Sequence, residues 1–380
     1  MIHTALGHES SLPKRPTKLL IVRLDASGDV LMCTPAIHAL RHAGFQLSLL
    51  TSTSGALVGS RLDDIDQVII FDAPWMKASS GGSGAQMLAM AEQLRGCDFD
   101  AAVILHSYSQ SPLPAAMLCQ LAGIPRQLAY CRENPYQLLS DWVREPEPES
   151  LVRHEVQRQL DLVKRWGGIL HGEPRLRICL SADDRHAAGA ALARTGLQEN
   201  ERFLLLHPGA TAPSRRYPLS SWIETCKLLL DIGKLPLVLA GSVEERPLLM
   251  QLQQGVRRQR LPVIDTLDFG GLAALIGYAS LLIANNSAPA HLAAAMNTPV
   301  VVLYASTNPQ HTPWTEQSRV LSYVVPCAPC YRSTCPQLHH ACMTNIRPSD
   351  IVNTVIDLLK DIEKTASCFE KYDDWIAPSA

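Results

Sequence analysis

Short apolar runs alternate with helical patterns along most of this chain. Nine runs of five to eight residues are rich in Leu, Ile and Val, and they lie at 18–24, 45–52, 67–72, 101–106, 202–208, 235–241, 262–266, 280–286 and 299–306. Continuous apolar strands separated by helices indicate parallel sheets, because crossover helices then bury both faces of each sheet. The pattern therefore predicts the α/β fold class.

A break in this rhythm separates the fourth run from the fifth. Residues 131–200 are rich in charged residues and helix formers, so a domain boundary is expected near 180–200. We predict two α/β domains that face each other across a cleft, over residues 1–185 and 186–347. A final helix and tail over 348–380, with the tail from 366, is expected to pack back toward the N-terminal domain.

The composition is that of a globular protein, with 47% hydrophobic and 18% charged residues. The 34 Lys and Arg residues against 36 Asp and Glu residues give a net charge of -2, so no global basic field attracts nucleic acid. The longest apolar stretches are shorter than a bilayer span, and the polar N-terminus lacks the apolar segment of a secretory signal. We expect a cytoplasmic protein.

Cysteine is frequent and unevenly distributed. The total of eleven is odd, and seven cysteines are scattered, which is typical of a reducing compartment rather than of a disulfide framework. The other four lie within sixteen residues: Cys327, Cys330, Cys335 and Cys342. Two interpretations stay open, a structural zinc or iron site and reduced, merely buried thiols, because the usual second Cys-x-x-Cys pair is lacking.

Motifs of the commoner nucleotide-binding folds are missing. The sequence holds no GxxxxGK[ST], and its one GxG, at residues 82–84, does not follow an apolar run. Neither a P-loop nor a dinucleotide-binding fingerprint is therefore indicated. Kinases and dehydrogenases are disfavoured as functional classes.

A polar turn follows the first apolar run, at the strand end where open α/β sheets bind ligands. It reads Asp25, Ala26, Ser27, Gly28 and Asp29 and leads into a helical pattern. Two interpretations of Asp29 stay open. The carboxylate caps a helix, or it acts as a general base beside a glycine that lets a substrate approach the backbone.

Two further polar turns follow runs of the second domain. In the first, a strand breaks at His207, and Arg215 and Arg216 precede a helix N-terminus, which favours an anion such as a diphosphate. A solvated pair of surface arginines is the alternative. The second turn holds Asn286, Ser287 and Ala288 before a helix that contains His291. This histidine either donates to a phosphate or is a core histidine satisfied by a carbonyl.

The acceptor side is less clearly marked in the sequence. His106 and Tyr108 follow the fourth run and are expected to face the same cleft. His154 and Arg158 are four residues apart on one predicted helix face. For this second pair we favour a solvated helix face.

Taken together, these segments resemble a known family. Residues 23–40 (RLDASGDVLMCTPAIHAL), 207–222 (HPGATAPSRRYPLSSW), 239–246, 275–309 and the cysteine segment are similar in order and spacing to glycosyltransferase family 9. Its members are the ADP-heptose-dependent heptosyltransferases of lipopolysaccharide core synthesis. The resemblance extends over about residues 17–360.

The resemblance implies a GT-B fold, with an N-terminal acceptor domain and a C-terminal nucleotide-sugar domain, both Rossmann-like. It implies that Asp29 is the base of an inverting transfer that demands no metal. The donor site then comprises His207, Gly209, Thr211, Arg215, Arg216, Asn286, Ser287, Ala288 and His291. The acceptor side comprises Asp25, Ser27, Gly28, His106 and Tyr108. A glycan acceptor that is lipid-linked would bring the protein to the inner membrane surface by peripheral contact only.

The sequence departs from the family pattern at two positions. Asn286 stands where the family usually has Asp, and Ala288 where it has Gly. An amide carries no charge and offers donors as well as an acceptor, so the identity of the donor sugar is less firmly implied than the fold. The alternatives are a non-catalytic nucleotide-sugar-binding protein, a transferase using another nucleotide sugar or a protein acceptor, and an epimerase or hydrolase of the donor.

Overall fold

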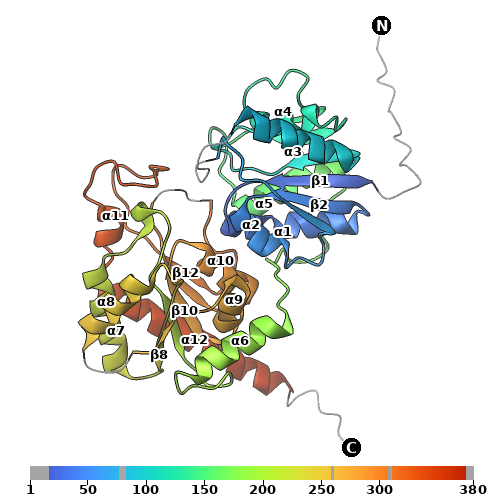
Figure 1. The fold of residues 1–380 in the computed structure, drawn as a ribbon. Helices are drawn as coiled ribbons and strands as arrows, with labels where there is room; N and C mark the ends of the chain where they lie inside the picture. Colours follow the sequence, from blue (N-terminus) through green and yellow to red (C-terminus); the bar gives the residue numbers. More distant parts are fainter. Residues whose placement is uncertain (1–16, 77–82, 258–260, 307, 309, 374–380) are drawn as a thin grey trace, which may run out of the picture.

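The chain forms two α/β units, seen one above the other in Figure 1. The structure is a computed structural model that describes residues 17–76, 83–257, 261–306, 308 and 310–373, with side chains as far as residue 364. Each unit is built on one six-stranded sheet in which all neighbouring strands are parallel. The predicted α/β class is confirmed.

The N-terminal sheet has the strand order β3-β2-β1-β4-β5-β6. Its strands are β1 (Lys18–Arg23), β2 (Gln46–Thr51), β3 (Gln67–Ile70), β4 (Ala101–Ile104), β5 (Gln127–Cys131) and β6 (Asp141–Arg144). One face is covered by α1 (Ser27–His42), α2 (Thr53–Gly59), α5 (Glu155–Val163) and the short η1 (Lys164–Trp166), the other by α3 (Gly84–Gly96) and α4 (Leu113–Leu121). Leu19 and Leu20 of β1 pack on opposite faces, which explains its continuous apolar run.

The C-terminal sheet repeats this architecture with the order β12-β11-β10-β7-β8-β9. Its strands are β7 (Leu204–His207), β8 (Leu237–Ala240), β9 (Val263–Ile264), β10 (Leu281–Asn285), β11 (Val300–Leu303) and β12 (Ser318–Leu321). One face carries α6 (Ala182–Ala193), α9 (Phe269–Tyr278) and α10 (Ala288–Ala295), the other α7 (Leu219–Ile232), α8 (Arg246–Val256) and α12 (Pro348–Asp373). The short η2 (Pro213–Arg215) and α11 (Ala341–Thr344) lie in loops.

All nine apolar runs contain a strand. The structure adds β5, β6 and β12, which the hydrophobic pattern did not indicate. β6 and β12 are edge strands with few fully buried residues, so their sequences DWVR and SRVL carry no continuous apolar run. Edge strands of this kind lack the signal that a central strand gives.

The domain boundary lies slightly before the expected position. Helix α6 packs against α9 of the C-terminal unit, so a boundary at residue 185 would cut this helix, and the division falls instead in the segment between η1 and Ser181. The prediction that the last helix returns to the N-terminal domain is wrong: α12 packs on α7, β11 and β12. It also continues to Asp373, into the segment expected to be tail; residues 374–380 lie outside the described residues.

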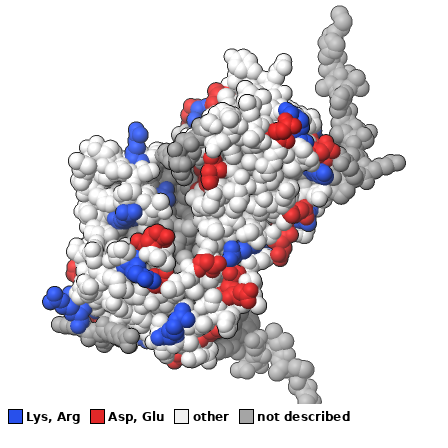
Figure 2. Space-filling model, viewed as in Figure 1, with Lys and Arg blue, Asp and Glu red and all other residues white. Residues whose placement is uncertain are grey.

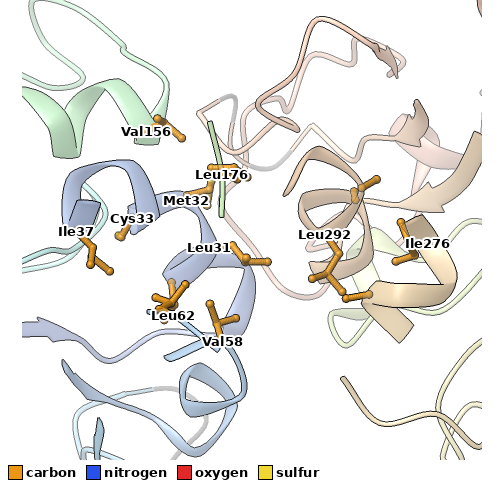
Figure 3. Close-up of a cluster of buried hydrophobic side chains, with 14 of the residues drawn as sticks. Leu31, Met32, Cys33, Ile37, Val58, Leu62, Val156, Leu176, Ile276 and Leu292 are labelled. Carbon is orange, nitrogen blue, oxygen red and sulfur yellow. The ribbon is translucent and has the colours of Figure 1, made fainter. Parts of the chain in front are cut away.

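The two units meet through the helices on their facing sides. One hydrophobic cluster runs from α1 and α2 of the first unit to α9 and α10 of the second. Leu31 on α1 and Leu292 on α10 face each other in Figure 3 and are fully buried. Fully burying a leucine stabilises a fold by about 1.5–3 kcal/mol, so this shared core holds the domains closely together.

An ionic contact closes the edge of the junction. Arg61, which follows α2, lies 3.0 Å from Asp184 on α6 and 3.2 Å from Asp268, the residue before α9. Both acidic residues accept backbone N–H groups at helix starts. Arg61 therefore connects the first domain to two helix N-termini of the second.

Candidate active site

The polar turns singled out in the sequence lie at the points where each strand order changes direction. In the N-terminal sheet this point lies between β1 and β4, and in the C-terminal sheet between β7 and β10. Asp25 to Asp29 and His106 follow the first pair, and His207 to Arg215 and Asn286 to His291 follow the second. Open α/β sheets bind ligands at these switch points, so each domain presents its own candidate site toward the junction.

Asp29 lies in the first turn of α1. It caps this helix, as one of the two interpretations predicted, and it remains suited to act as a general base. Its Oδ2 accepts the backbone N–H of Ala26 at 3.3 Å, and its Oδ1 lies 3.3 Å from Arg23 Nη2. Burial raises the pKa of Asp29, although Arg23 opposes the rise. A carboxylate with a raised pKa is a better proton acceptor near neutral pH, so capping and base chemistry are compatible here.

A buried ionic network surrounds this carboxylate, and the sequence interpretation missed it. Arg23 is fully buried and lies 3.0 Å from Asp25 and 2.8 Å from Glu155. Burial alone would raise the pKa of Glu155, but the charges of Arg23 and Arg158 outweigh it and hold this pKa at about 2. An arginine ending an otherwise apolar strand was the available signal, because a buried charge requires a partner.

The helix face that carries Arg158 is buried, which corrects the expectation of a solvated face. Arg158 is fully buried and pairs with Glu145 and Glu147. His154 caps α5, and its Nε2 lies 2.8 Å from the carbonyl oxygen of Thr312 in the second domain. This face thus carries part of the contact between domains.

The acceptor-side residues differ in their freedom to meet a ligand. Both ring nitrogens of His106 face backbone carbonyls, at 2.9 and 2.8 Å, so this side chain has no nitrogen left for an acceptor. The hydroxyl of Tyr108 hydrogen-bonds that of Tyr331 from the cysteine segment. Asp25 accepts from Gln110 at 2.6 Å, and the backbone N–H of Ser27 donates to Ser54. Asp25 and Asp29 stay partly exposed.

The two adjacent arginines on the donor side have different surroundings. Arg216 donates to the carbonyl oxygens of Ala210 and Thr211 and so braces its own loop. The Arg215 guanidinium forms no hydrogen bond or ion pair within the described part of the chain, and its charge acts on Asp29 and His291. A half-buried guanidinium without such a partner is available to an anion.

A carboxylate that the sequence interpretation overlooked lies beside this loop. Glu245 accepts the backbone N–H of Ser242 at 2.9 Å and lies 3.6 Å from His207 Nε2. A Cβ on Gly209 would come within 1.7 Å of it, so a larger residue there would displace the Glu245 carboxylate. Thr211 is exposed at the rim of the same loop. Burial lowers the pKa of His207, and its Nδ1 has no hydrogen-bond partner among the described residues.

The two neighbouring asparagines in the turn before α10 have different surroundings. Asn285, fully buried, donates to the Pro208 carbonyl at 2.6 Å and accepts from the Tyr217 N–H at 3.3 Å. Asn286 is buried beside the hydroxyl of Tyr304. The hydroxyl of Ser287, the residue before α10, makes only long hydrogen bonds of 3.4–3.5 Å to described residues. Asn285 therefore fixes the turn, and Asn286 and Ser287 border the junction.

His291 is the residue of α10 that approaches the first domain. A Cβ on Gly28 would lie 3.0 Å from its ring and 3.7 Å from Ala288. Burial lowers the pKa of His291 to about 3, and its Nδ1 has no hydrogen-bond partner among the described residues. The interpretation as a carbonyl-satisfied core histidine is therefore not supported for this nitrogen.

The cysteine segment forms a wall beside the Arg215 loop rather than a recognisable metal centre. Ser214 bonds to Arg332, Ser333 and His340, and burial raises the pKa of the Cys342 thiol. No group of three or more His, Cys, Asp or Glu side chains within the described ranges is arranged to hold a metal ion. A structural zinc or iron site at the four cysteines stays a prediction.

The face of the molecule drawn in Figure 2 gives little indication of a large charged partner. Basic and acidic side chains are interspersed on the face drawn in Figure 2. Of the helices that the structure describes, none has both the length and the apolar character needed to cross a bilayer. The absence of nucleic-acid binding stays a prediction.

Two facing domains of this strand order, each with polar turns at its switch point, define the GT-B class of folds. A family model described as glycosyltransferase family 9 (heptosyltransferase) matches residues 87–341, and the chain belongs to this family. The fold expectation is confirmed by E. coli ADP-heptose lipopolysaccharide heptosyltransferase II, with a TM-score of 0.70 at 20% identity over 91% of this chain and all of that one.

Two curated relatives agree with this assignment. Lipooligosaccharide heptosyltransferase 2 of Campylobacter jejuni is 26% identical over 43% of this chain, and the match spans about half of that protein, 53%. Lipopolysaccharide heptosyltransferase 1 of Pseudomonas aeruginosa is 24% identical over 84% of this chain and 87% of its own length.

Proposed function

We propose that this protein transfers a heptose from ADP-heptose, with inversion at the anomeric carbon, to a hydroxyl of a lipopolysaccharide core or related bacterial glycan. The observation that carries the proposal is the proximity of Asp29, a partly exposed carboxylate with a raised pKa, to two groups of the opposite domain. These are the Arg215 guanidinium and His291 Nδ1, and neither has a hydrogen-bond partner among the described residues. A base on one side and anion-binding groups on the other are what a displacement at a sugar diphosphate requires.

Asp29 acts as the general base in this proposal. It takes the proton of the acceptor hydroxyl as the oxygen attacks the anomeric carbon from the face opposite the diphosphate. The bond to the diphosphate breaks in the same step, which inverts the configuration. General base assistance of this kind contributes about 10² to 10⁴ in rate.

The leaving diphosphate is stabilised from the second domain. Arg215 supplies a positive charge and a planar fork that suits phosphate. The N-terminus of α10 and His291 Nδ1, which has no partner within the described residues, supply further donors. Together they offset the charge that grows on the diphosphate as the bond breaks.

The nucleotide is assigned to the loops after β7 and β8. His207, Gly209 and Thr211 line the first loop, braced by Arg216. Glu245 stands at the carboxyl end of β8, where acidic residues of Rossmann-like domains accept ribose hydroxyls. The similar E. coli protein is named an ADP-heptose heptosyltransferase, which supports adenine and heptose as donor components.

The acceptor is assigned to the first domain. Asp25, Ser27 and Gly28 border Asp29, and Tyr108 lies at the rim, whereas His106 supports the loop. A lipopolysaccharide core acceptor is lipid-linked, so the protein would reach it at the inner membrane surface through peripheral contact.

Asn286 and Ala288 favour a second candidate, a related transferase that uses a different nucleotide sugar. An amide at 286 pairs with sugar hydroxyls differently from a carboxylate. Arg215 and Asp29 retain their places in this alternative, so the two candidates differ only in the donor that binds.

Calorimetric titration of the protein with ADP, UDP, GDP and ADP-heptose tests the proposal. We expect selective ADP and ADP-heptose binding that Arg215→Ala weakens about tenfold or more, whereas Arg216→Ala, one residue away, weakens it less. Asp29→Asn should bind normally and lose transfer to a core acceptor. Preference for another nucleotide would support the second candidate, and absence of nucleotide binding would refute both.

A further inference from the structure

A loop of the second domain is fastened to the first domain on both sides of one histidine. Gln310 donates to Glu147 at 2.9 Å and to the Arg153 carbonyl at 2.8 Å, and its own carbonyl accepts the N–H of Glu155 at 3.1 Å. On the other side, the Thr312 carbonyl lies 2.8 Å from His154 Nε2. The residue between them, His311, is thereby held at a fixed place at the start of α5.

His311 lies between two carboxylates of the first domain. Its Nδ1 is 3.7 Å from Asp29 Oδ1, and its Nε2 is 3.9 Å from Glu155 Oε2. Both separations exceed a hydrogen bond, and catalytic contacts of this length commonly shorten when a substrate complex forms. Glu155 Oε2 has no hydrogen-bond partner among the described residues.

The neighbouring amide selects which ring nitrogen carries the hydrogen. Asn308 Oδ1 accepts the N–H of Gln310 at 2.9 Å, which leaves Asn308 Nδ2 facing His311 Nε2 at 3.5 Å. An amide nitrogen only donates, so Nε2 accepts and Nδ1 carries the hydrogen of a neutral ring. That hydrogen points toward Asp29.

The charged and titratable groups around the imidazole leave it neutral near pH 7. Burial lowers the pKa of His311 to about 4, and the charge of Glu155 only partly opposes this. The groups that face it come from β1, the α1 turn, α5, η2 and α10: Arg23, Asp25, Asp29, His154, Glu155, Arg215 and His291. A neutral donor orients Asp29 without adding a charge.

We propose that His311 is a positioning residue, through which the nucleotide-sugar domain orients the Asp29 base of the acceptor domain. The proposal rests on the proposed function, because it assigns Asp29 that role. Asp29 receives an Arg23 contact and a backbone N–H from its own domain, and His311 supplies the donor from the other. The base is then fully oriented only while the domains are together.

Three substitutions separate this role from a merely structural one. His311→Phe keeps a buried ring and removes the donor. His311→Asn places an amide N–H near the position of Nδ1, whereas His311→Gln places it near that of Nε2. His38→Asn is the matched control, since His38 lies on the same helix as Asp29 but contacts Asp64 at 3.0 Å, outside the junction.

The experiment follows the titration of the Asp29 carboxyl by carbon NMR in the full-length protein, assigned with Asp29→Asn. A hydrogen bond to a carboxylate stabilises its ionised form. We expect the midpoint to move to higher pH in His311→Phe and to return toward the wild-type value in His311→Asn only. In the transfer assay, kcat should fall about tenfold or more in His311→Phe, with its acid limb displaced to higher pH and ADP affinity unchanged.

The outcomes distinguish this proposal from the function on which it rests. An unchanged Asp29 titration in His311→Phe overturns the positioning role. The role is also overturned if His311→Gln, and not His311→Asn, restores the Asp29 midpoint, because the ring N–H of the wild type would then point to Glu155. If the titration moves as expected while the wild type transfers no sugar, the proposed function fails and the contact between His311 and Asp29 stands.

Discussion

Gly28 on α1 faces His291 on α10 across the domain junction. A Cβ added to Gly28 would lie 3.0 Å from Cδ2 of His291. That distance is tighter than ordinary van der Waals contact, so either the His291 ring or the helices α1 and α10 must shift to admit a larger residue. Overpacking of this kind costs about 1–3 kcal/mol. The junction therefore depends on glycine at a position where the backbone itself is an ordinary helix.

Gly28→Val is expected to open the domains. We predict a larger radius of gyration in solution X-ray scattering and a loss of transfer of about tenfold or more. Gly84→Val is the matched control, because Gly84 also begins a helix of the first domain but has no described atom within 4 Å of its Cβ position. Equal scattering curves for the two variants would contradict the prediction.

Glu155→Gln should destabilise the protein strongly. The substitution keeps the shape but removes a charge that faces Arg23 and Arg158 in the interior. Leaving buried charges less compensated costs about 3–5 kcal/mol, measurable as a lower urea midpoint.

The comparison for this variant is an exposed ion pair of the same domain. Asp66→Asn breaks the contact with Arg41, where the side chains are 32% and 37% exposed, and should cost about 1 kcal/mol or less. A loss for Glu155→Gln no larger than this would show that the buried network does not hold the domain together.

Stability is expected to fall as the pH drops from about 6.5 toward 4. Burial lowers the pKa of His106, His154 and His311 to about 4 and that of His291 to about 3. The unfolded chain binds protons on these residues at higher pH than the folded chain, so acid favours unfolding, by up to about 1.4 kcal/mol per pH unit for each histidine.

Urea unfolding at pH 7, 6 and 5 measures this dependence. His154→Gln should reduce the slope of the unfolding free energy against pH by the contribution of about one histidine. Glutamine can still donate to the Thr312 carbonyl, but it does not titrate. Equal stability at pH 7 and pH 5 would mean that these rings are already protonated or hydrated in the folded state.

Asn285 and Asn286 should respond oppositely to truncation. Asn285→Ala removes a buried amide that bonds Pro208 and Tyr217, and should cost about 1–3 kcal/mol because those groups lose their partner. Asn286→Ala should leave the unfolding midpoint nearer the wild type and weaken binding of the nucleotide sugar more than of the nucleotide. The reverse pattern would assign the structural role to Asn286.

Local sequence patterns predicted most of the strands and the polar turns, because these depend on short runs of neighbouring residues. β1 was evident from KLLIVRL, and the turn after it from Asp25 to Asp29. Contacts between distant segments were not accessible in this way. Glu155 and Arg23 are separated by 132 residues, and no pattern near either names the other.

The position of α12 shows that local patterns also fail to predict which sheet a helix packs against. Its apolar face was detectable, but whether that face meets the first or the second sheet depends on where the chain runs after β12. Likewise, Gln310 and Thr312 bond to Glu147 and to residues 153–155 of the first domain, so the role of these loop residues followed only from the assembled domains.

The repetition of one strand order in both sheets has a consequence for how such a protein can change. Each domain builds its ligand-binding turns from the strand ends of its own sheet. One domain can therefore be exchanged for that of a relative, with the junction placed in the segment between η1 and α6. What such a hybrid must preserve is the fit of α1 against α10, including glycine opposite the imidazole. Substrate preference would then be inherited domain by domain, whereas the contact between α1 and α10 would have to be inherited as a pair.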